Sequence, residues 1–299
     1  MNLNIIKKTK LWFTLSGMLI VLGICGLLFN SVTRGKPMNF GIDFTGGTMI
    51  NVRFNSPNIS AANPVKIADV RDVLHHYKLG EAVIQRSGER DVFIRTEPIE
   101  TETRQQIIQE LYQKYDGVDL LEADTIGPVI GAELRAQAFW ALVLALIGIL
   151  IYVSFRFEFV FATAAVVALA HDAIITTGIM AILWRSIDIS FIAAILTILG
   201  YSINDTIVIF DRIRENSKKP AYRKLSFAQM VNESIWETMA RSINTVLTVL
   251  VMVLAFLFFG GETLREFSLT LLIGFTAGAY SSIFIASPLV VMWSKKENP

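Results

Sequence analysis

The chain of 299 residues is 53% hydrophobic and only 18% charged, and its formal net charge is +1. Soluble domains carry roughly 25% charged residues, so this composition is typical of a membrane protein. The near-neutral charge gives no reason to expect a nucleic-acid partner. A single cysteine, Cys25, excludes an intrachain disulfide, and we expect its thiol to pack among apolar neighbours.

Six apolar blocks are long enough to cross a membrane, which takes roughly 20 helical residues. They run from Leu11 to Phe29, Gln137 to Phe155, Phe159 to Leu183, Ile189 to Phe210, Ser242 to Phe259 and Phe267 to Trp293. The first block is longer than the apolar region of a signal peptide, so we interpret it as an uncleaved anchor. The sequence therefore predicts a polytopic α-helical membrane protein with six transmembrane helices.

Basic residues in the short flanks of these blocks predict the orientation of the chain. One side of the membrane receives only Arg185 and Arg265. The other receives Lys7, Lys8, Lys10, Arg156, Arg212, Arg214, Lys218, Lys219, Arg223, Lys224, Lys295 and Lys296. We therefore expect both termini to be cytoplasmic. The expected division is 1–30 for the N-terminus and first helix, 31–136 for an external (periplasmic) domain, and 137–299 for helices two to six, with a basic cytoplasmic loop at 211–241.

The segment 31–136 has a soluble composition and alternates strand and helix periods. "GTMINVRF" has the alternation of a strand, and Asn63 is expected to cap a helix that begins at Pro64. A hairpin is predicted around residues 87–89, a second helix begins near Thr101, and "GVDLLEADTI" closes with a strand. The order β-α-β-β-α-β predicts a ferredoxin-like α+β domain between the first and second transmembrane helices.

We find no pattern of a catalytic, cofactor or metal site in the chain. His75 and His76 are adjacent, so on a helix they point about 100° apart and cannot bind a metal as an i, i+4 pair could. Gly46 and Gly47 lie in "FGIDFTGGT", but no phosphate-binding G-x-x-x-x-G-K-[ST] is present, and the pair is interpreted as a turn into the first strand. We therefore expect a protein that is not an enzyme and has no cofactor.

Ionisable residues within the apolar blocks are the candidates for function, because each costs at least about 2.5 kcal/mol to place in hydrocarbon. They are Asp172 beside His171, Asp205 beside Asn204, and Arg241. The rise of 1.5 Å per residue places Asp172 about 17 Å, Asp205 about 24 Å and Arg241 about 28 Å from the outer helix ends. Asp172 is then near the midplane, and an ion pair between Asp205 and Arg241 is expected.

Two interpretations of Asp205 remain open from the residues alone. Tyr201 and Ser202 share its helix face, so a polar face could carry protons, and a pair that opens with conformation would couple protonation to motion. Alternatively, Asp205 and Arg241 form a static pair that fixes helix register, or Arg241 extends to the inner boundary. His171 and Asp172 likewise form either a relay or a packing contact.

Two further segments leave their contacts open. Gly274, Gly278, Ser282 and Ala286 recur every four residues in the sixth block, which predicts a close helix contact, either internal or with a partner. The inner loop 211–241 is basic and then amphipathic. It could lie on anionic lipid or form a cytoplasmic docking surface.

Four motifs resemble the SecF family, the smaller membrane subunits of bacterial SecD–SecF pairs. They are "FGIDFTGGT", "IGPVIGAEL", "ALAHD" and "LGYSINDTIVIFDRIREN", and the resemblance covers nearly the whole chain. It implies the fold of the resistance-nodulation-division superfamily and a place in the bacterial cytoplasmic (inner) membrane. It also implies that the protein assists the export of preproteins by means of the proton motive force.

The same resemblance implies the partners and the proton-linked residues. The partners would be SecD, the SecYEG channel, YajC-type and YidC-type accessory membrane proteins, the translocating preprotein and the lipid bilayer. A role in proton movement carries onto Asp205 in "SINDT", with less motif support onto Arg241, and weakly onto Asp172 in "HD". His171 and Asn204 stand beside these carboxylates. A scaffold that stabilises SecD or the channel without conducting protons is the alternative function, and a free-standing efflux transporter is disfavoured because one external domain leaves little room for a drug-sized pocket.

Overall fold

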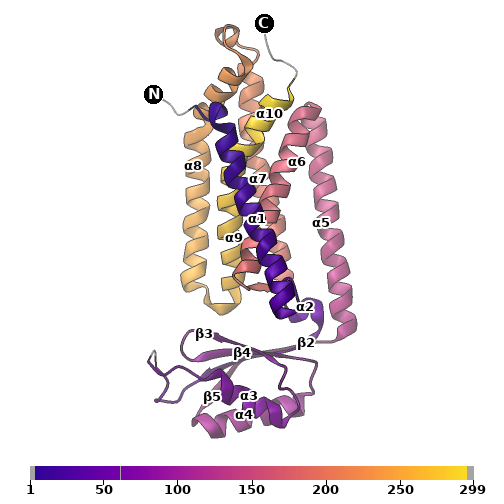
Figure 1. Ribbon diagram of the computed structural model, residues 1–299, viewed down its shortest axis with the longest axis vertical. Coiled ribbons are helices and arrows are strands. Elements are labelled where there is room, and N and C mark those ends of the chain that lie inside the picture. The colour runs from indigo at the N-terminus through magenta and orange to yellow at the C-terminus, as the bar shows by residue number, and fades with distance from the viewer. Residues whose placement is uncertain (1–3, 61, 295–299) are drawn as a thin grey trace. The chain divides into compact units, whose positions relative to one another are not determined.

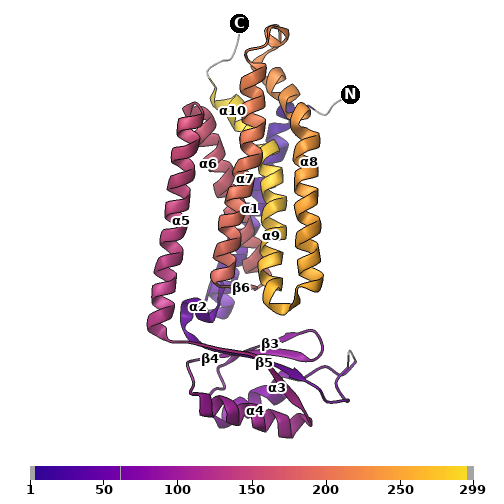
Figure 2. The ribbon, with the colours of Figure 1, turned by 180° about the vertical axis from the view of Figure 1, so that it is seen from behind.

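The computed structural model describes residues 4–60 and 62–294. It divides into a membrane unit, formed by the chain before Phe40 and after Phe139, and an α+β unit formed by residues 40–139. Six helices in the described part of the chain are long and apolar enough to cross a membrane. The predicted number of spans is therefore confirmed, and Figures 1 and 2 show the helices of the membrane unit running alongside one another.

The elements of the membrane unit follow the apolar blocks closely. The helices are η1 (Ile6–Lys8), α1 (Thr9–Arg34), α5 (Pro128–Arg156), α6 (Phe159–Ile182), α7 (Ile189–Asn216), η2 (Pro220–Tyr222), α8 (Phe227–Phe259), α9 (Gly261–Ser281), a π-helical turn η3 (Ser282–Ala286) and α10 (Ser287–Trp293). The short strands are β1 (Asn39–Phe40) and β6 (Ser186–Ile187). The last membrane span consists of α9, η3 and α10 together.

Helices α5 and α8 begin earlier than the apolar blocks predicted. Helix α8 starts at Phe227, where Ser226 and Gln229 form a reciprocal capping box, and it continues without a break into the apolar part. The connection from α7 is therefore 217–226, and the loop expected at 211–241 is wrong. Apolar length measures only the part of a helix in hydrocarbon, whereas the capping signal at Ser226 marks where the helix begins.

The small residues of α9 are used for internal packing. A Cβ on Gly274 would overlap the side chain of Ile198, and one on Gly278 would lie 3.0 Å from the Cβ of Ser202. Both contacts are with α7, and Figure 2 shows α7 and α9 side by side along most of their length. The face identified in the sequence therefore brings these two backbones close together.

Helices α1 and α6 also pack closely together, at a point where each helix contributes a glycine. A Cβ on Gly23 would lie 3.0 Å from the Cα of Gly178. Cys25, two positions along α1 from Gly23, is exposed, so the expected packing of its thiol is wrong. Only one face of α1 is buried, and the apolar character of the block could not reveal which face that is.

Polar contacts join the helix ends that carry most of the basic residues. The Ile5 amide donates to Asn232 Oδ1 at 2.8 Å, which holds the residue before η1 against α8. Arg156 at the end of α5 pairs with Asp211 of α7 at 3.0 Å. These contacts collect the N-terminal segment, the α5–α6 turn and the α7–α8 connection at one end of the membrane unit (Figure 1). The sequence placed the same three segments on one side of the membrane.

The α+β unit has the predicted order of elements. They are α2 (Ile42–Thr45), β2 (Gly47–Phe54), α3 (Ile67–His76), β3 (Val83–Ser87), β4 (Asp91–Thr96), α4 (Thr101–Tyr115) and β5 (Val118–Ile126). All neighbouring strands are antiparallel, in the order β3-β4-β2-β5, with Ile50 opposite Ile94. Helices α3 and α4 cover one face of this sheet (Figure 1). The core between them includes Ile50, Val70, Leu74, Ile94, Ile107 and Leu111.

The local turn predictions in this unit had different outcomes. Gly46 and Gly47 have φ angles of 71° and 133°, which confirms that they turn the chain into the first strand. The expected helix start at Pro64 is wrong, because Asn63 pairs with Ser60 and α3 begins at Ile67.

A hydrogen bond also joins the two helices of this unit. The hydroxyl of Tyr115 on α4 donates to Asp69 on α3. Burial, followed by the charge of Asp69, raises the pKa of this hydroxyl.

Candidate functional site

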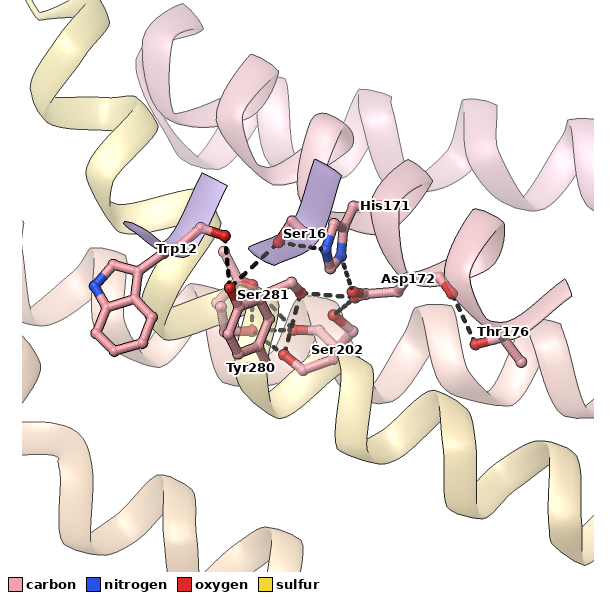
Figure 3. Close-up of polar contacts among 11 residues, drawn as sticks. Trp12, Ser16, His171, Asp172, Thr176, Ser202, Tyr280 and Ser281 are labelled. Atoms are coloured by element: carbon pink, nitrogen blue, oxygen red, sulfur yellow. Dashed lines mark hydrogen bonds and ion pairs between the residues drawn. The ribbon is translucent and has the colours of Figure 1, made fainter. Parts of the chain in front are cut away.

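A buried polar cluster lies within the membrane unit and is centred on Asp172 of α6 (Figure 3). The Asp172 side chain has no exposed surface. Ser202 of α7 donates to its Oδ2 at 2.6 Å, and Ser281 of α9 donates to the same oxygen at 2.8 Å. The Nδ1 of His171 lies 2.9 Å from Oδ1. Both oxygens of Asp172 are therefore held by side chains, as a carboxylate buried in a membrane requires.

The cluster extends from His171 to the first helix. The Nε2 of His171 lies 3.1 Å from the Oγ of Ser16 on α1. Ser16 in turn donates to the hydroxyl of Tyr280 at 3.3 Å, and Tyr280 donates to the Trp12 carbonyl at 2.8 Å. Figure 3 shows these groups in sequence between α1, α6 and α9. We call Asp172, His171, Ser16, Tyr280, Ser202 and Ser281 the Asp172 network, which joins helices α1, α6, α7 and α9.

The glycine at position 278 makes room for this network. A Cβ there would lie 3.5 Å from Asp172 Oδ2 and 3.0 Å from the Ser202 Cβ. Further along α7, the Thr206 hydroxyl lies 2.8 Å from that of Ser282, the first residue of the π-helical turn η3. Such turns interrupt the regular bonding of a helix and are common at functional sites. The network thus borders the one π-helical segment in the described part of the chain.

Asp205 has fewer contacts than Asp172. Ser242 of α8 donates to its Oδ1 at 2.6 Å. Its Oδ2 is buried and has no hydrogen-bond partner among the residues that the structure describes. The hydroxyl of Tyr201, one turn away on the same helix, is likewise buried without a described partner. Asp205 is 8% exposed, so it is buried but less completely than Asp172.

The expected ion pair between Asp205 and Arg241 is not formed. Arg241 is exposed, and the residue that reaches Asp205 from α8 is its neighbour Ser242. Consecutive residues on a helix point about 100° apart, so only one of the two can face α7. Asp205 and Arg241 were expected to lie at a similar level, and the contact from Ser242 agrees with this, but the level does not determine the direction in which a side chain points.

Asn204 also points away from the cluster, since it is exposed on α7. Of the five candidates from the sequence, the structure joins His171 and Asp172 directly. It places Asp205 one turn from Ser202 on α7, and it leaves Asn204 and Arg241 on the outside of the bundle. Neither exposed side chain contributes to the Asp172 network.

Four contributing residues were not identified from the sequence: Ser16, Ser242, Tyr280 and Ser281. Small hydroxyl residues are frequent in transmembrane helices, where they bond their own backbone, so their presence alone carries little information. Ser281 and Ser242 lie next to residues that did attract attention. Ser16 contacts a partner 155 residues away in the chain, which no local pattern could indicate.

The chemistry available to this cluster is proton exchange and hydrogen bonding. In the described part of the chain, no group of three or more His, Cys, Asp or Glu residues could hold a metal ion. The cluster contains one carboxylate, one imidazole and several hydroxyls, and Asp205 adds a second carboxylate one turn further along α7; such groups are the components of proton relays in membrane proteins.

Comparison with known proteins gives the family of the chain. The model of the C-terminal region of the protein export membrane proteins SecD and SecF matches residues 106–296, and the SecD/SecF GG motif matches residues 35–57. The chain belongs to the SecF family. The protein translocase subunit SecF of Sebaldella termitidis is 40% identical over 299 residues, covering 100% of this chain and 94% of that protein. SecF of Desulfurispirillum indicum is 42% identical over 275 residues, covering 89% and 85% of the two chains.

A fused SecF relative has a solved structure. The crystal structure of SecDF from Thermus thermophilus, described as a translocon-associated membrane protein, matches 98% of this chain with a TM-score of 0.86 and 37% identity. The match covers 39% of the SecDF chain. This SecF chain is thus similar to one part of a longer polypeptide that carries SecD and SecF together.

The SecF motif around Gly46 and Gly47 has a clear role in packing. A Cβ on Gly46 would lie 3.0 Å from the Cα of Pro128, and one on Gly131 would lie 2.9 Å from the Gly46 amide nitrogen. Pro128 and Gly131 belong to "IGPVIGAEL" at the start of α5. The two glycine-containing motifs therefore pack against each other inside the α+β unit, where larger side chains do not fit.

Proposed function

We propose that this chain works with a SecD-type partner to assist preprotein translocation across the bacterial cytoplasmic membrane, and that Asp205 is the carboxylate through which the proton motive force acts. The names of its relatives, which are translocase subunits, support the export role. The proposal assigns no bond-breaking reaction to the chain. It places the termini in the cytoplasm and the α+β unit on the outer side, in agreement with the distribution of basic residues.

The unpaired Oδ2 of Asp205 is the observation that carries this proposal. A buried carboxylate oxygen without a donor is unstable as a charged group, so it favours protonation, water or a donor from a partner. Ser242 supports the other oxygen and leaves this one available. Asp205 is thus positioned to gain and lose a proton without the loss of an existing contact.

The exposed polar residues beside Asp205 support a partner in the membrane. Asn204 and Arg241 lie on neighbouring helices, within spans that are otherwise apolar, and both are exposed. Polar side chains at such positions are costly against lipid and usually face another helix or water. The fused SecDF relative indicates a SecD-type subunit as that partner. Contacts with the SecYEG channel and with accessory subunits belong to the same proposal.

The α+β unit supports a ferredoxin-like assignment. Its order of elements and its antiparallel sheet order, β3-β4-β2-β5, match a split β-α-β arrangement in which both helices pack on one face. We assign no binding residue to this unit, because the polar contact of its described histidines, between His76 of α3 and Glu110 of α4, joins its own two helices.

Preprotein export into membrane vesicles, with and without a proton gradient, tests the proposal. The vesicles contain the SecD-type partner and the wild-type chain, Asp205→Asn or Arg241→Met. Thr276→Val is the matched control, because Thr276 is exposed on α9 and its hydroxyl bonds only its own helix. We expect Asp205→Asn to abolish the stimulation of export by the gradient, while the export that remains without a gradient is close to that of the wild type.

A non-conducting scaffold is the second candidate, and the fully satisfied bonds of Asp172 favour it. Under that function, Asp205→Asn would lower export equally with and without the gradient, or not at all. Retention of full stimulation by the gradient in Asp205→Asn would contradict our assignment.

A further inference from the structure

The hydrogen bonds of the Asp172 network have a direction that fixes the number of protons they contain. The Trp12 carbonyl can only accept, and the Tyr280 hydroxyl has a single proton, so Tyr280 must donate to Trp12. Ser16 then donates to Tyr280, and its oxygen must accept from the Nε2 of His171. His171 therefore carries a proton on Nε2 in this arrangement.

The remaining contact must hold exactly one more proton in any bonded arrangement. The Nδ1 of His171 and the Oδ1 of Asp172 are 2.9 Å apart, and without a proton between them two acceptors would face each other. Ser202 and Ser281 occupy Oδ2, so they do not supply that proton. The pair is thus either an imidazolium with a carboxylate or a neutral imidazole with a carboxylic acid, and in both forms its net charge is zero.

The removal of one proton allows the whole chain of hydrogen bonds to reverse. A neutral imidazole with its proton on Nδ1 donates to the Asp172 carboxylate, and Nε2 becomes an acceptor. Ser16 then donates to Nε2, and Tyr280 turns to donate to Ser16. The bond from Tyr280 to the Trp12 carbonyl is lost in this state, and the net charge of the pair becomes −1.

We propose that His171 and Asp172 share one exchangeable proton, and that Ser16 and Tyr280 are positioning residues that transmit its presence to helix α1. When the pair holds the proton, Tyr280 of α9 donates to the Trp12 carbonyl of α1, and when the proton is lost Tyr280 donates to Ser16 of the same helix instead. Proton uptake adds one proton to the pair and reverses the two hydroxyls, without any other reactant. This inference rests on the proposed proton-linked function and adds a second proton-holding group to it.

In the described hydrogen bonds, no charged side chain other than the pair itself contacts His171 or Asp172. The groups that face it are Ser16 on α1, Ser202 on α7, and Tyr280 and Ser281 on α9. Asp205, one turn beyond Ser202, is bonded to α8 through Ser242 instead. The rings of His171 and Tyr280 are stacked with their centroids 6.0 Å apart, which holds these two side chains beside each other.

Nitrogen NMR of the histidine side chains in the full chain with its SecD-type partner, in lipid nanodiscs, tests the proposal. The chain has three histidines, so His171→Gln identifies the signal of interest. We expect Nε2 to be protonated at the acid end of the titration and unprotonated at the alkaline end. An Nε2 that keeps one protonation state throughout would overturn the proposal.

Three variants separate a shared proton from mere packing. We expect Asp172→Asn to fix Nε2 in the protonated form, because the amide donates to Nδ1 and holds no exchangeable charge. Ser16→Ala should separate the Trp12 carbonyl signal from the His171 transition, because it breaks the chain of hydroxyls between Nε2 and Tyr280. Tyr280→Phe should abolish the pH-dependent change in the Trp12 carbonyl carbon signal that accompanies the His171 transition in the wild type.

A matched control and two contradicting outcomes complete the test. Thr276→Val should leave the His171 transition unchanged, since its hydroxyl bonds only within α9. A tautomer that still follows pH in Asp172→Asn would refute the shared proton, and a Trp12 signal that still changes with pH in Tyr280→Phe would refute the transmission to α1. The measurement needs neither a gradient nor a preprotein, so its failure is distinguishable from failure of the export experiment.

Discussion

The two buried carboxylates of the membrane unit differ in how completely their oxygens are occupied. Asp172 has both oxygens bonded, by groups from α6, α7 and α9. Asp205 has one oxygen bonded by Ser242 and one without a described partner. The first is fully enclosed, whereas the second lies near exposed polar residues.

This difference separates two roles that the sequence alone could not distinguish. A carboxylate that accepts hydrogen bonds from several helices holds those helices together. Any change in its charge must also change the hydrogen bonds of its neighbours. A carboxylate with a vacant acceptor can change its protonation state at little structural cost. We therefore assign the joining of helices to Asp172, whose proton is shared internally, and exchange with the surroundings to Asp205.

Asp172→Ala should have the largest effect on stability. It leaves Ser202, Ser281 and His171 without their acceptor in a site that excludes water, and each unsatisfied group costs about 1 to 3 kcal/mol. We expect the free energy of unfolding in a denaturing-detergent titration to fall by about 3 to 5 kcal/mol. Asp172→Asn, which retains an acceptor for the serines, should lose much less. Equal losses in the two variants would contradict the bonding role.

Gly278→Val should have the next largest effect, because a side chain at this position meets both Ser202 and Asp172. Overpacking of this kind typically costs about 1 to 3 kcal/mol. The matched control is Gly148→Val on α5, where a Cβ would meet nothing within 4 Å. The same titration measures both variants. A loss at position 148 as large as that at 278 would show that β-branching in a helix, rather than crowding at the network, is the cause.

Ser242→Ala should have a smaller effect, since it removes the single described bond of Asp205. We expect a loss of about 1 kcal/mol in the free energy of unfolding, the usual value of one hydrogen bond. Gradient-stimulated export should also weaken, because Asp205 is less firmly positioned. Ser242→Thr, which keeps a hydroxyl, should restore both quantities. If Ser242→Thr behaves like Ser242→Ala, Ser242 does not act through this bond.

Asp205→Asn should have the smallest effect on stability. The amide still accepts from Ser242, and the substitution removes a buried charge that lacks a second partner. We expect the free energy of unfolding to change by less than about 1 kcal/mol, in contrast to Asp172→Ala. Destabilisation as large as that of Asp172→Ala would remove the distinction between the two carboxylates.

The sequence identified the candidate residues more accurately than it predicted the contacts that these residues make. Charges stand out in apolar runs, so Asp172 and Asp205 were identified at once, and helix periodicity placed Ser202 on the same face as Asp205. The ion pair with Arg241 failed because depth follows from residue count, whereas the direction of a side chain depends on how two helices are rotated. Ser16 and Tyr280 lie 264 residues apart, and only packing brings them together.

The predictions of the fold relied on the pattern of apolar residues and were weakest at the ends of the helices. Apolar length gave the six spans, and alternating periods gave the strand and helix order of the α+β unit. The start of α8 at Phe227 and of α3 at Ile67 differed, because helix ends depend on capping bonds and turns that apolar length does not record.

An infrared titration of protonated carboxyl groups tests most directly whether Asp205 exchanges protons with its surroundings. Spectra of the wild-type complex in lipid are compared with those of Asp205→Asn across the pH range in which the complex is stable. We expect the wild-type spectra to contain a carboxyl band that grows as pH falls, is sensitive to deuterium exchange, and is missing in Asp205→Asn. Identical titrating bands in the two proteins would contradict it.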